Sequence, residues 1–271
     1  MRANTNRSGA LSFGRLADDY QTGRFQVSSA EVEYIRTRAH GEGISARFSR
    51  VLEIGAGTGQ LTRALVRQPQ HLTALEPDAT FRGILASLLS EYVSRGSLRI
   101  LPVKFEEVDD DVEAGSLDEI WSCDAFHWVD PALGYELASR LTTANGKLIL
   151  LWRFPYAADQ QLRRALNSIF HDLSPDLVRD DDFVDQLQLL CAEGRTEMSS
   201  SGYFRPSVHW WMDRIVPMSP ERFASLQLSL GHIANMTPCE RQQLRSAILG
   251  VVGESSVEVR LLMYVVVGAK T

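Results

Sequence analysis

The sequence is poor in cysteine, which excludes two kinds of stabilised protein. Its 271 residues include three cysteines, Cys123, Cys191 and Cys239, which are odd in number, far apart and without a CxxC pair. That pattern fits neither a disulfide framework nor a zinc site held by cysteine. It is typical of a reducing compartment, so we expect a cytoplasmic protein without a metal.

The chain also lacks an excess of positive charge and a long apolar run. Its formal net charge is -6 at pH 7, whereas binding to nucleic acid depends on clustered Lys and Arg, so no nucleic-acid partner is expected. The longest apolar run, residues 261–269, is about half as long as a membrane-spanning helix requires. The first residues carry no apolar stretch of about seven residues, so we expect neither a membrane segment nor a secretory signal.

What the chain does have is a globular composition and an alternating pattern. Hydrophobic residues make up 44% and charged residues 23% of the sequence, which suffices for one large core domain with additions. Short apolar runs alternate with stretches of helical periodicity, and this order predicts a doubly wound α/β fold, a parallel sheet with helices on both faces. We expect strands at residues 51–54, 71–75, 98–103, 117–122 and 147–152, and helices at residues 59–68, 79–94 and 131–141.

The remaining segments predict additions on either side of this unit. A periodic stretch at residues 30–38 indicates a helix, and two amphipathic helices follow the last expected core strand. Residues 208–216 and 257–269 are typical of later strands, with a helix near 241–249 between them, so the sheet should be seven-stranded and mostly parallel. We expect an N-terminal helical cap at residues 1–48, a cofactor-binding core at 49–154, a helical insertion forming a substrate wall at 155–205 and a C-terminal part completing the core at 206–271.

Three glycines at alternate positions follow the first expected strand, in the stretch VLEIGAGTGQLT at residues 51–62. Gly55, Gly57 and Gly59 let the chain turn and let a ligand lie against bare main chain, where amides at a helix start suit an anionic group. A dinucleotide fingerprint would require a glycine at Gln60. The pattern ExGxGxG therefore disfavours a nicotinamide-dependent oxidoreductase, which stays as the alternative.

This pattern resembles the first motif of class I S-adenosylmethionine-dependent methyltransferases, and ALEPDATF resembles their second motif. The segments LPVKFEEVD and DEIWSCDAFHWVDP are similar to those after the third and fourth strands of small-molecule methyltransferases related to trans-aconitate methyltransferase. The opening FGRLADDYQTGR matches the N-terminal pattern of that group, so the resemblance covers nearly the whole chain. It implies a Rossmann-like methyltransferase fold and S-adenosylmethionine as the cofactor.

The resemblance assigns a ribose-binding role to Glu76, because a carboxylate can accept hydrogen bonds from both ribose hydroxyls. The open alternative is an ordinary carboxylate at a strand end. Lys104 departs from the family, which often has an acidic residue there to meet the adenine amino group; Lys cannot accept that bond. Adenine recognition would then fall to the backbone near Phe105. The residues expected to bind the cofactor are Tyr20, Glu53, Gly55, Gly57, Gly59, Glu76, Pro77, Phe105, Glu106 and Cys123.

His127, in the stretch AFHW, is the candidate base. It should lie at the carboxyl edge of the sheet, where open α/β folds bind ligands, and an imidazole there could take a proton from the acceptor. The alternative is a histidine that only shapes the pocket. The N-terminal pattern implies that Tyr20 closes over the methionyl end of the cofactor and belongs to the catalytic set, and packing of the cap is its alternative. Arg24 is a weaker candidate.

Aromatic residues provide candidates for binding the acceptor. Trp128, Trp210 and Trp211 could form a wall for a flat molecule, but alternation along a strand lets only one of the last two face a pocket. His232, in SLGHIANM, is a further candidate for binding the substrate; the alternative is a loop histidine without a role in binding.

The sequence therefore predicts methyl transfer from S-adenosylmethionine to a small organic acceptor, in specialised metabolism. Whether the methylated atom is oxygen, nitrogen or carbon stays open, as do an aromatic or carboxylic acceptor and the oligomeric state. A non-catalytic cofactor-binding protein is a second alternative. RNA as acceptor is a third, which the acidic charge disfavours.

Overall fold

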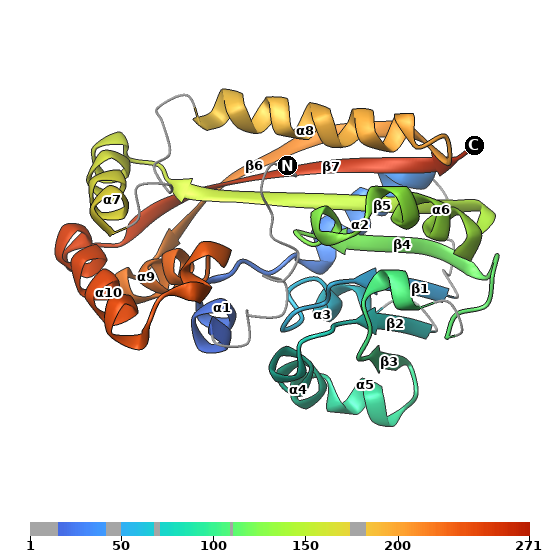
Figure 1. Ribbon diagram of the computed structural model, residues 1–271, viewed down its shortest axis with the longest axis horizontal. Coiled ribbons are helices and arrows are strands. Elements are labelled where there is room, and N and C mark those ends of the chain that lie inside the picture. Colours follow the sequence, from blue (N-terminus) through green and yellow to red (C-terminus); the bar gives the residue numbers. More distant parts are fainter. Residues whose placement is uncertain (1–15, 42–49, 68–70, 109–110, 174–182) are drawn as a thin grey trace.

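The computed structural model describes residues 16–41, 50–67, 71–108, 111–173 and 183–271. One sheet has the strand order β3-β2-β1-β4-β5-β7-β6 (Figure 1). The first five strands in this order are parallel, and β7 runs antiparallel to both β5 and β6. The expected seven-stranded, mostly parallel sheet is confirmed. Its strands are β1 (Arg50–Ile54), β2 (His71–Leu75), β3 (Leu98–Leu101), β4 (Leu117–Cys123), β5 (Thr142–Ala157), β6 (Phe204–Met218) and β7 (Val257–Lys270).

Helices cover both faces of the sheet, because side chains of buried strands alternate between two apolar cores. Leu148 and Leu150 of β5 join one core, together with residues of α6 and α8. Ile149 and Leu151 join the other, with residues of α2, α3 and α4. These helices are α2 (Ser29–His40), α3 (Thr62–Leu65), α4 (Ala79–Leu88), α6 (Pro131–Leu141) and α8 (Phe183–Ser200), with α5 (Ser90–Ser94) following α4.

A third apolar core lies where β5, β6 and β7 extend beyond the parallel strands. Four helices gather around it, at one end of the molecule in Figure 1. They are α1 (Ala17–Gly23), α7 (Gln160–Leu173), α9 (Pro220–Leu228) and α10 (Pro238–Val252). Three short 3-10 helices complete the described elements: η3 (Phe105–Glu107), η4 (Phe126–Trp128) and η6 (Gly231–Asn235).

Several boundaries differ from the expected ones. The helix expected at 59–68 is reduced to α3, because residues 57–61 form turns around the glycines. The helix expected at 79–94 is divided into α4 and α5 at Leu89, whose φ of -118° and ψ of 27° are not helical. The strand expected at 98–103 ends at Leu101.

The two longest strands also exceed the expected bounds. β5 continues to Ala157, because its end pairs with β7 beyond the parallel core. β6 begins at Phe204, and the two helices of the expected insertion lie between these strands. Among the described residues, no helix is both long enough and apolar enough to cross a membrane.

Candidate active site

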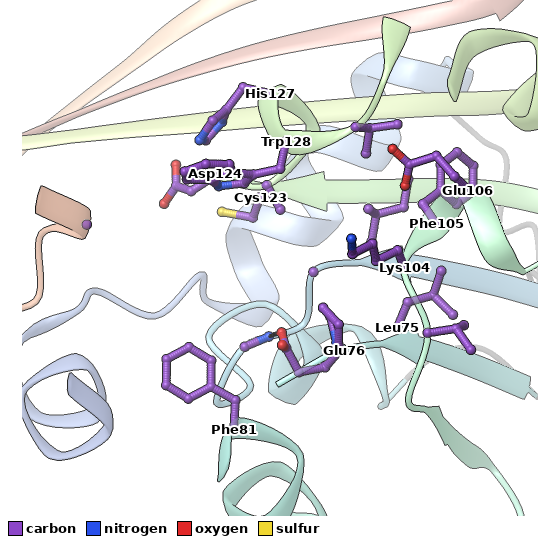
Figure 2. A pocket seen from close by; sticks show the side chains of 18 of the residues that line it. Leu75, Glu76, Phe81, Lys104, Phe105, Glu106, Cys123, Asp124, His127 and Trp128 are labelled. Atoms are coloured by element: carbon purple, nitrogen blue, oxygen red, sulfur yellow. Dashed lines mark hydrogen bonds between the residues drawn. The ribbon is translucent and has the colours of Figure 1, made fainter. Parts of the chain in front are cut away.

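A cavity of about 630 Å³ opens at the carboxyl ends of β1, β2, β4 and β5. Figure 2 shows Glu76 and Phe81 on one side of it and His127 and Trp128 on the opposite side. The volume is in the range of cavities that bind small molecules and cofactors. Of the residues expected to bind a cofactor or acceptor, those that line it are Tyr20, Gly55, Gly57, Glu76, Pro77, Phe105, Glu106, Cys123, His127 and Trp128.

The glycine loop after β1 forms the floor of the cavity. Gly55 and Gly57 have φ angles of 69° and 58°, a region that L side chains rarely adopt. A Cβ added at Gly55 would lie 2.4 Å from the Cβ of Ala125. The loop backbone therefore faces the cavity without side chains of its own. Gly59 does not line the cavity; a Cβ there would lie 2.9 Å from Cδ1 of Leu85, so its role is to let α4 pack closely.

Glu76 follows β2 and is held by the main chain. Its Oε2 accepts a hydrogen bond of 2.7 Å from the Gly57 amide, and its Oε1 accepts one of 2.8 Å from the Asp78 amide. Burial raises the pKa of the carboxyl group, while these two bonds oppose the rise. Each carboxylate oxygen can accept more than one hydrogen bond. Glu76 therefore keeps capacity for two donors from the cavity.

The segment after β3 forms another part of the cavity wall. Figure 2 shows Lys104, Phe105 and Glu106 there. Phe105 is buried in η3, while Oε1 of Glu106 accepts a 2.8 Å hydrogen bond from the Asp130 amide at the start of α6. Cys123 ends β4 at the cavity, and burial raises the pKa of its thiol. Lys104 therefore places an amino group, and not a carboxylate, at this part of the cavity wall.

Residues 52–150 match the model of the family described as methyltransferase domain. An uncharacterised methyltransferase from Mycobacterium tuberculosis is 30% identical over 149 residues, 55% of this chain and 54% of that protein. One from Geobacillus kaustophilus is 33% identical over 136 residues, 48% of this chain and 60% of that protein. The chain thus spans about half the length of the curated relatives it matches.

A solved structure from Anaeromyxobacter dehalogenans, described as a type II methyltransferase, covers 91% of this chain and 97% of its own, with a TM-score of 0.60 and 14% identity. That likeness shows the fold alone. The family match covers residues 52–150, less than half of the chain. This part of the chain is similar to a methyltransferase domain. S-adenosylmethionine is the cofactor that such a domain uses.

The residues of the cavity fit this cofactor. The bare glycine loop and the spare capacity of Glu76 provide places for its amino-acid part and its ribose. Glu53 lies beneath the loop, 1% exposed, and its Oε2 has no hydrogen-bond partner. Burial raises the pKa of Glu53 to about 8, and repulsion from Glu76 adds to this rise. Glu53 was expected to bind the cofactor, but it does not line the cavity.

The N-terminal helix α1 and the residue that follows it bring two further side chains to the cavity. The ring of Tyr20 lies 4.9 Å from that of Phe81, and the Arg24 guanidinium lies 5.1 Å from the centre of the Tyr20 ring. Both residues line the cavity. Burial raises the pKa of Tyr20, so its hydroxyl group is neutral.

His127 and Trp128 lie together in η4, with ring centres 5.1 Å apart. Trp210 does not join them: it stacks on Arg38 at 4.9 Å and lies against Tyr34, on the α2 face of the sheet. Its expected place in the acceptor site is therefore corrected. It points away because successive side chains of a strand alternate, and the same alternation puts Trp211 on the other face.

Trp211 does not line the cavity either; it packs against Tyr264 at 4.8 Å and against Phe154. His232 falls in η6, but its side chain lies outside the described residues. Its neighbour Gly231 lines the cavity.

The residues of the cavity wall that sequence reasoning missed include Asp124, Trp152, Arg153 and Phe154. A signal was present, because one arginine interrupts the apolar run LILLWRF at the end of an expected buried strand. A buried charge requires a partner, and here the partner is Asp124. Among the residues that the structure describes, no three His, Cys, Asp or Glu side chains gather as a metal ion would require.

Proposed function

We propose that the protein transfers a methyl group from S-adenosylmethionine to a small organic acceptor, in specialised metabolism. The observation that carries this proposal is the position of Glu76, fixed by two main-chain amides at the edge of a cavity whose floor is bare glycine backbone. A relation to the trans-aconitate methyltransferase group is part of the proposal and rests on the sequence motifs alone.

Two side chains of the cavity have roles in this reaction. The bound cofactor supplies an electrophilic methyl group. Glu76 accepts hydrogen bonds from the ribose hydroxyls and so fixes the position of the cofactor. His127, on the opposite wall, takes the proton that a hydroxyl, amine or acidic carbon loses when it attacks the methyl group. Acceptor and cofactor are thereby held in line for displacement.

The aromatic lining supports a small acceptor with a flat or apolar part. Trp128, Trp152 and Phe154 contribute rings to the cavity wall, and aromatic faces bind such groups well. The net charge of -6 supports a small molecule rather than a nucleic acid. The few unpaired cysteines support a cytoplasmic location.

Calorimetry with S-adenosylhomocysteine tests the cofactor site without knowledge of the acceptor. We expect Glu76→Ala to weaken binding by about tenfold or more, because it removes hydrogen bonds to a charged group. Glu113→Ala, which changes an exposed carboxylate outside the cavity, should bind as the wild type does. Equal affinity in wild type and Glu76→Ala would remove Glu76 from the site, and absence of binding by the wild type would overturn the proposal.

Incubation with labelled S-adenosylmethionine and metabolite pools, read as a mass gain of one methyl group, identifies the acceptor. With that acceptor, His127→Ala should lower turnover by roughly 10²–10⁴-fold while cofactor affinity stays normal. His71→Ala, an exposed histidine on β2 outside this cavity, is the matched control. Turnover near the wild-type rate would show that His127 only shapes the pocket.

A further inference from the structure

An N-terminal segment, residues 16–27, crosses the carboxyl edge of the sheet and is called the strap here. It consists of α1 and the extended residues that follow it. Its side chains Tyr20 and Arg24 form one wall of the cavity. The position of the strap therefore sets how closely these two side chains can approach a bound cofactor.

One end of the strap is fixed to the C-terminal helices. A Cβ added at Gly23 would lie 2.3 Å from the amide nitrogen of Leu226, so α1 packs directly on the backbone of α9. Asp19 forms an ion pair with Arg245 of α10. These contacts lie outside the sheet and do not touch the cavity floor.

The other end of the strap is fixed to the cavity itself. The Val27 amide donates a 2.9 Å hydrogen bond to the carbonyl of Gln60 in the glycine loop. The Phe25 carbonyl accepts a hydrogen bond from Nη1 of Arg153. Arg153 belongs to β5, so a single side chain joins the strap to the end of a central strand.

Arg153 is itself held by a second residue of the cavity wall. Asp124 Oδ2 accepts a 2.8 Å bond from Nε of Arg153 and lies 2.7 Å from its Nη2. The other oxygen of Asp124 accepts a 2.7 Å bond from the Arg153 amide. Burial alone would lower the pKa of Arg153, but the Asp124 carboxylate and the other neighbours of the guanidinium together raise it. The guanidinium thus remains positively charged. Its Nε and Nη2 atoms face Asp124, and its Nη1 atom donates to the Phe25 carbonyl of the strap.

Asp124 adopts a backbone conformation that favours glycine. Its φ of 55° is the only positive value among the non-glycine residues that the structure describes. A residue in this region is strained and persists where its surroundings hold it. Asp tolerates the region better than most residues, and its three contacts with Arg153 supply the restraint. Strain of this kind concentrates at functional sites.

We infer that Asp124 and Arg153 are positioning residues, which hold the strap closed and thereby set Tyr20 and Arg24 against the cofactor. The inference rests on the proposed function, since it requires the cofactor in this cavity. The pair acts through the strap, so its loss should speed ligand release.

The test compares the release of S-adenosylhomocysteine from Arg153→Lys and Asp124→Asn with release from the wild type. Lys keeps the positive charge but lacks a fork that reaches both Asp124 and the Phe25 carbonyl; Asn keeps the shape without the charge. Stopped-flow tryptophan fluorescence follows release, because Trp128 and Trp152 line the cavity. Each variant should release the ligand roughly tenfold faster, the loss expected for a hydrogen bond to a charged group.

Hydrogen exchange provides a second readout, which does not depend on ligand binding. The Val27 amide should exchange faster in both variants than in the wild type. The double variant should be no worse than the more severe single variant, because residues that act as a unit are not additive. Matched controls are Asp213→Asn and Arg260→Lys, which alter an exposed Asp–Arg pair between β6 and β7.

Wild-type release rates and wild-type exchange at Val27 in both variants would overturn the inference while leaving the proposed function intact. If the wild type does not bind S-adenosylhomocysteine, the proposed function is refuted, and the inference falls with it. Faster exchange at Val27 would then show only that the Asp124–Arg153 pair attaches the strap. If the Arg153 and Asp124 variants do not fold, Asp19→Asn loosens the far end of the strap; unchanged release from that variant would also overturn the inference.

Discussion

Two buried glutamates on neighbouring parallel strands have opposite surroundings. Glu119 of β4 is 0% exposed and accepts hydrogen bonds from Arg36 at 2.7 Å and from Trp121 at 2.8 Å, with His40 at 3.0 Å. Glu53 of β1 is 1% exposed, and one of its oxygens has no partner. Residue type and burial are the same, so the partners make the difference.

The protonation of the two groups follows from those partners. Burial by itself would raise the pKa of Glu119, but the bonds from His40 and Arg36 outweigh it and lower the pKa. Burial outweighs the lowering effect of Arg153 on Glu53 and raises the pKa of Glu53 to about 8. Glu119 attaches α2 to the sheet and is a structural anion. Glu53 comes just before the glycine loop and keeps its proton below about pH 8, an arrangement that stability alone does not explain.

Glu119→Gln should have the largest effect on stability. It leaves the guanidinium of Arg36 buried without its counter-charge, which costs about 3–5 kcal/mol in comparable cases. Urea unfolding at pH 7 measures this loss, and the folded variant should still bind S-adenosylhomocysteine, because Glu119 lies outside the cavity. A loss below about 1 kcal/mol would show that the buried ion pair is not the main attachment of α2.

Glu53→Gln should change the pH dependence of stability. The folded state binds the proton of Glu53 more tightly than the unfolded state, since the pKa rises from 4.5 to about 8. The wild type is therefore favoured at low pH and loses stability as the pH rises through this window, by up to about 1.4 kcal/mol per pH unit. Urea titrations between pH 5 and 8.5 should show a shallower slope for Glu53→Gln. Equal slopes would mean that Glu53 ionises normally.

The strands of the fold were more predictable from the sequence than their boundaries. Apolar runs reveal buried strands directly, and all seven strands were found. Boundaries were less certain where local geometry overrides periodicity, as at Gly59, where turns replace the expected first turn of a helix. The length of β5 depends on its partner β7, more than a hundred positions later, which no local pattern contains.

The candidate site was predictable where one short motif supplies the residue. Glu76, Phe105 and His127 each follow a strand, and parallel strands bring their ends to one edge. Trp210 was misplaced because alternation says that neighbours face opposite ways without saying which face holds the cavity. The Asp124–Arg153 pair joins positions 29 apart, so it depends on the register of β4 and β5.

His40→Ala should have the smallest effect of the three stability changes and sharpens the comparison most. It removes one of the partners of Glu119 while Arg36 still neutralises the carboxylate, so we expect a loss of about 1 kcal/mol. Glu113→Gln, which breaks an exposed pair with Arg50, is the control and should change stability by less than about 0.5 kcal/mol. A loss at His40 as large as that of Glu119→Gln would mean that the imidazole, and not the guanidinium, is the partner that keeps Glu119 charged.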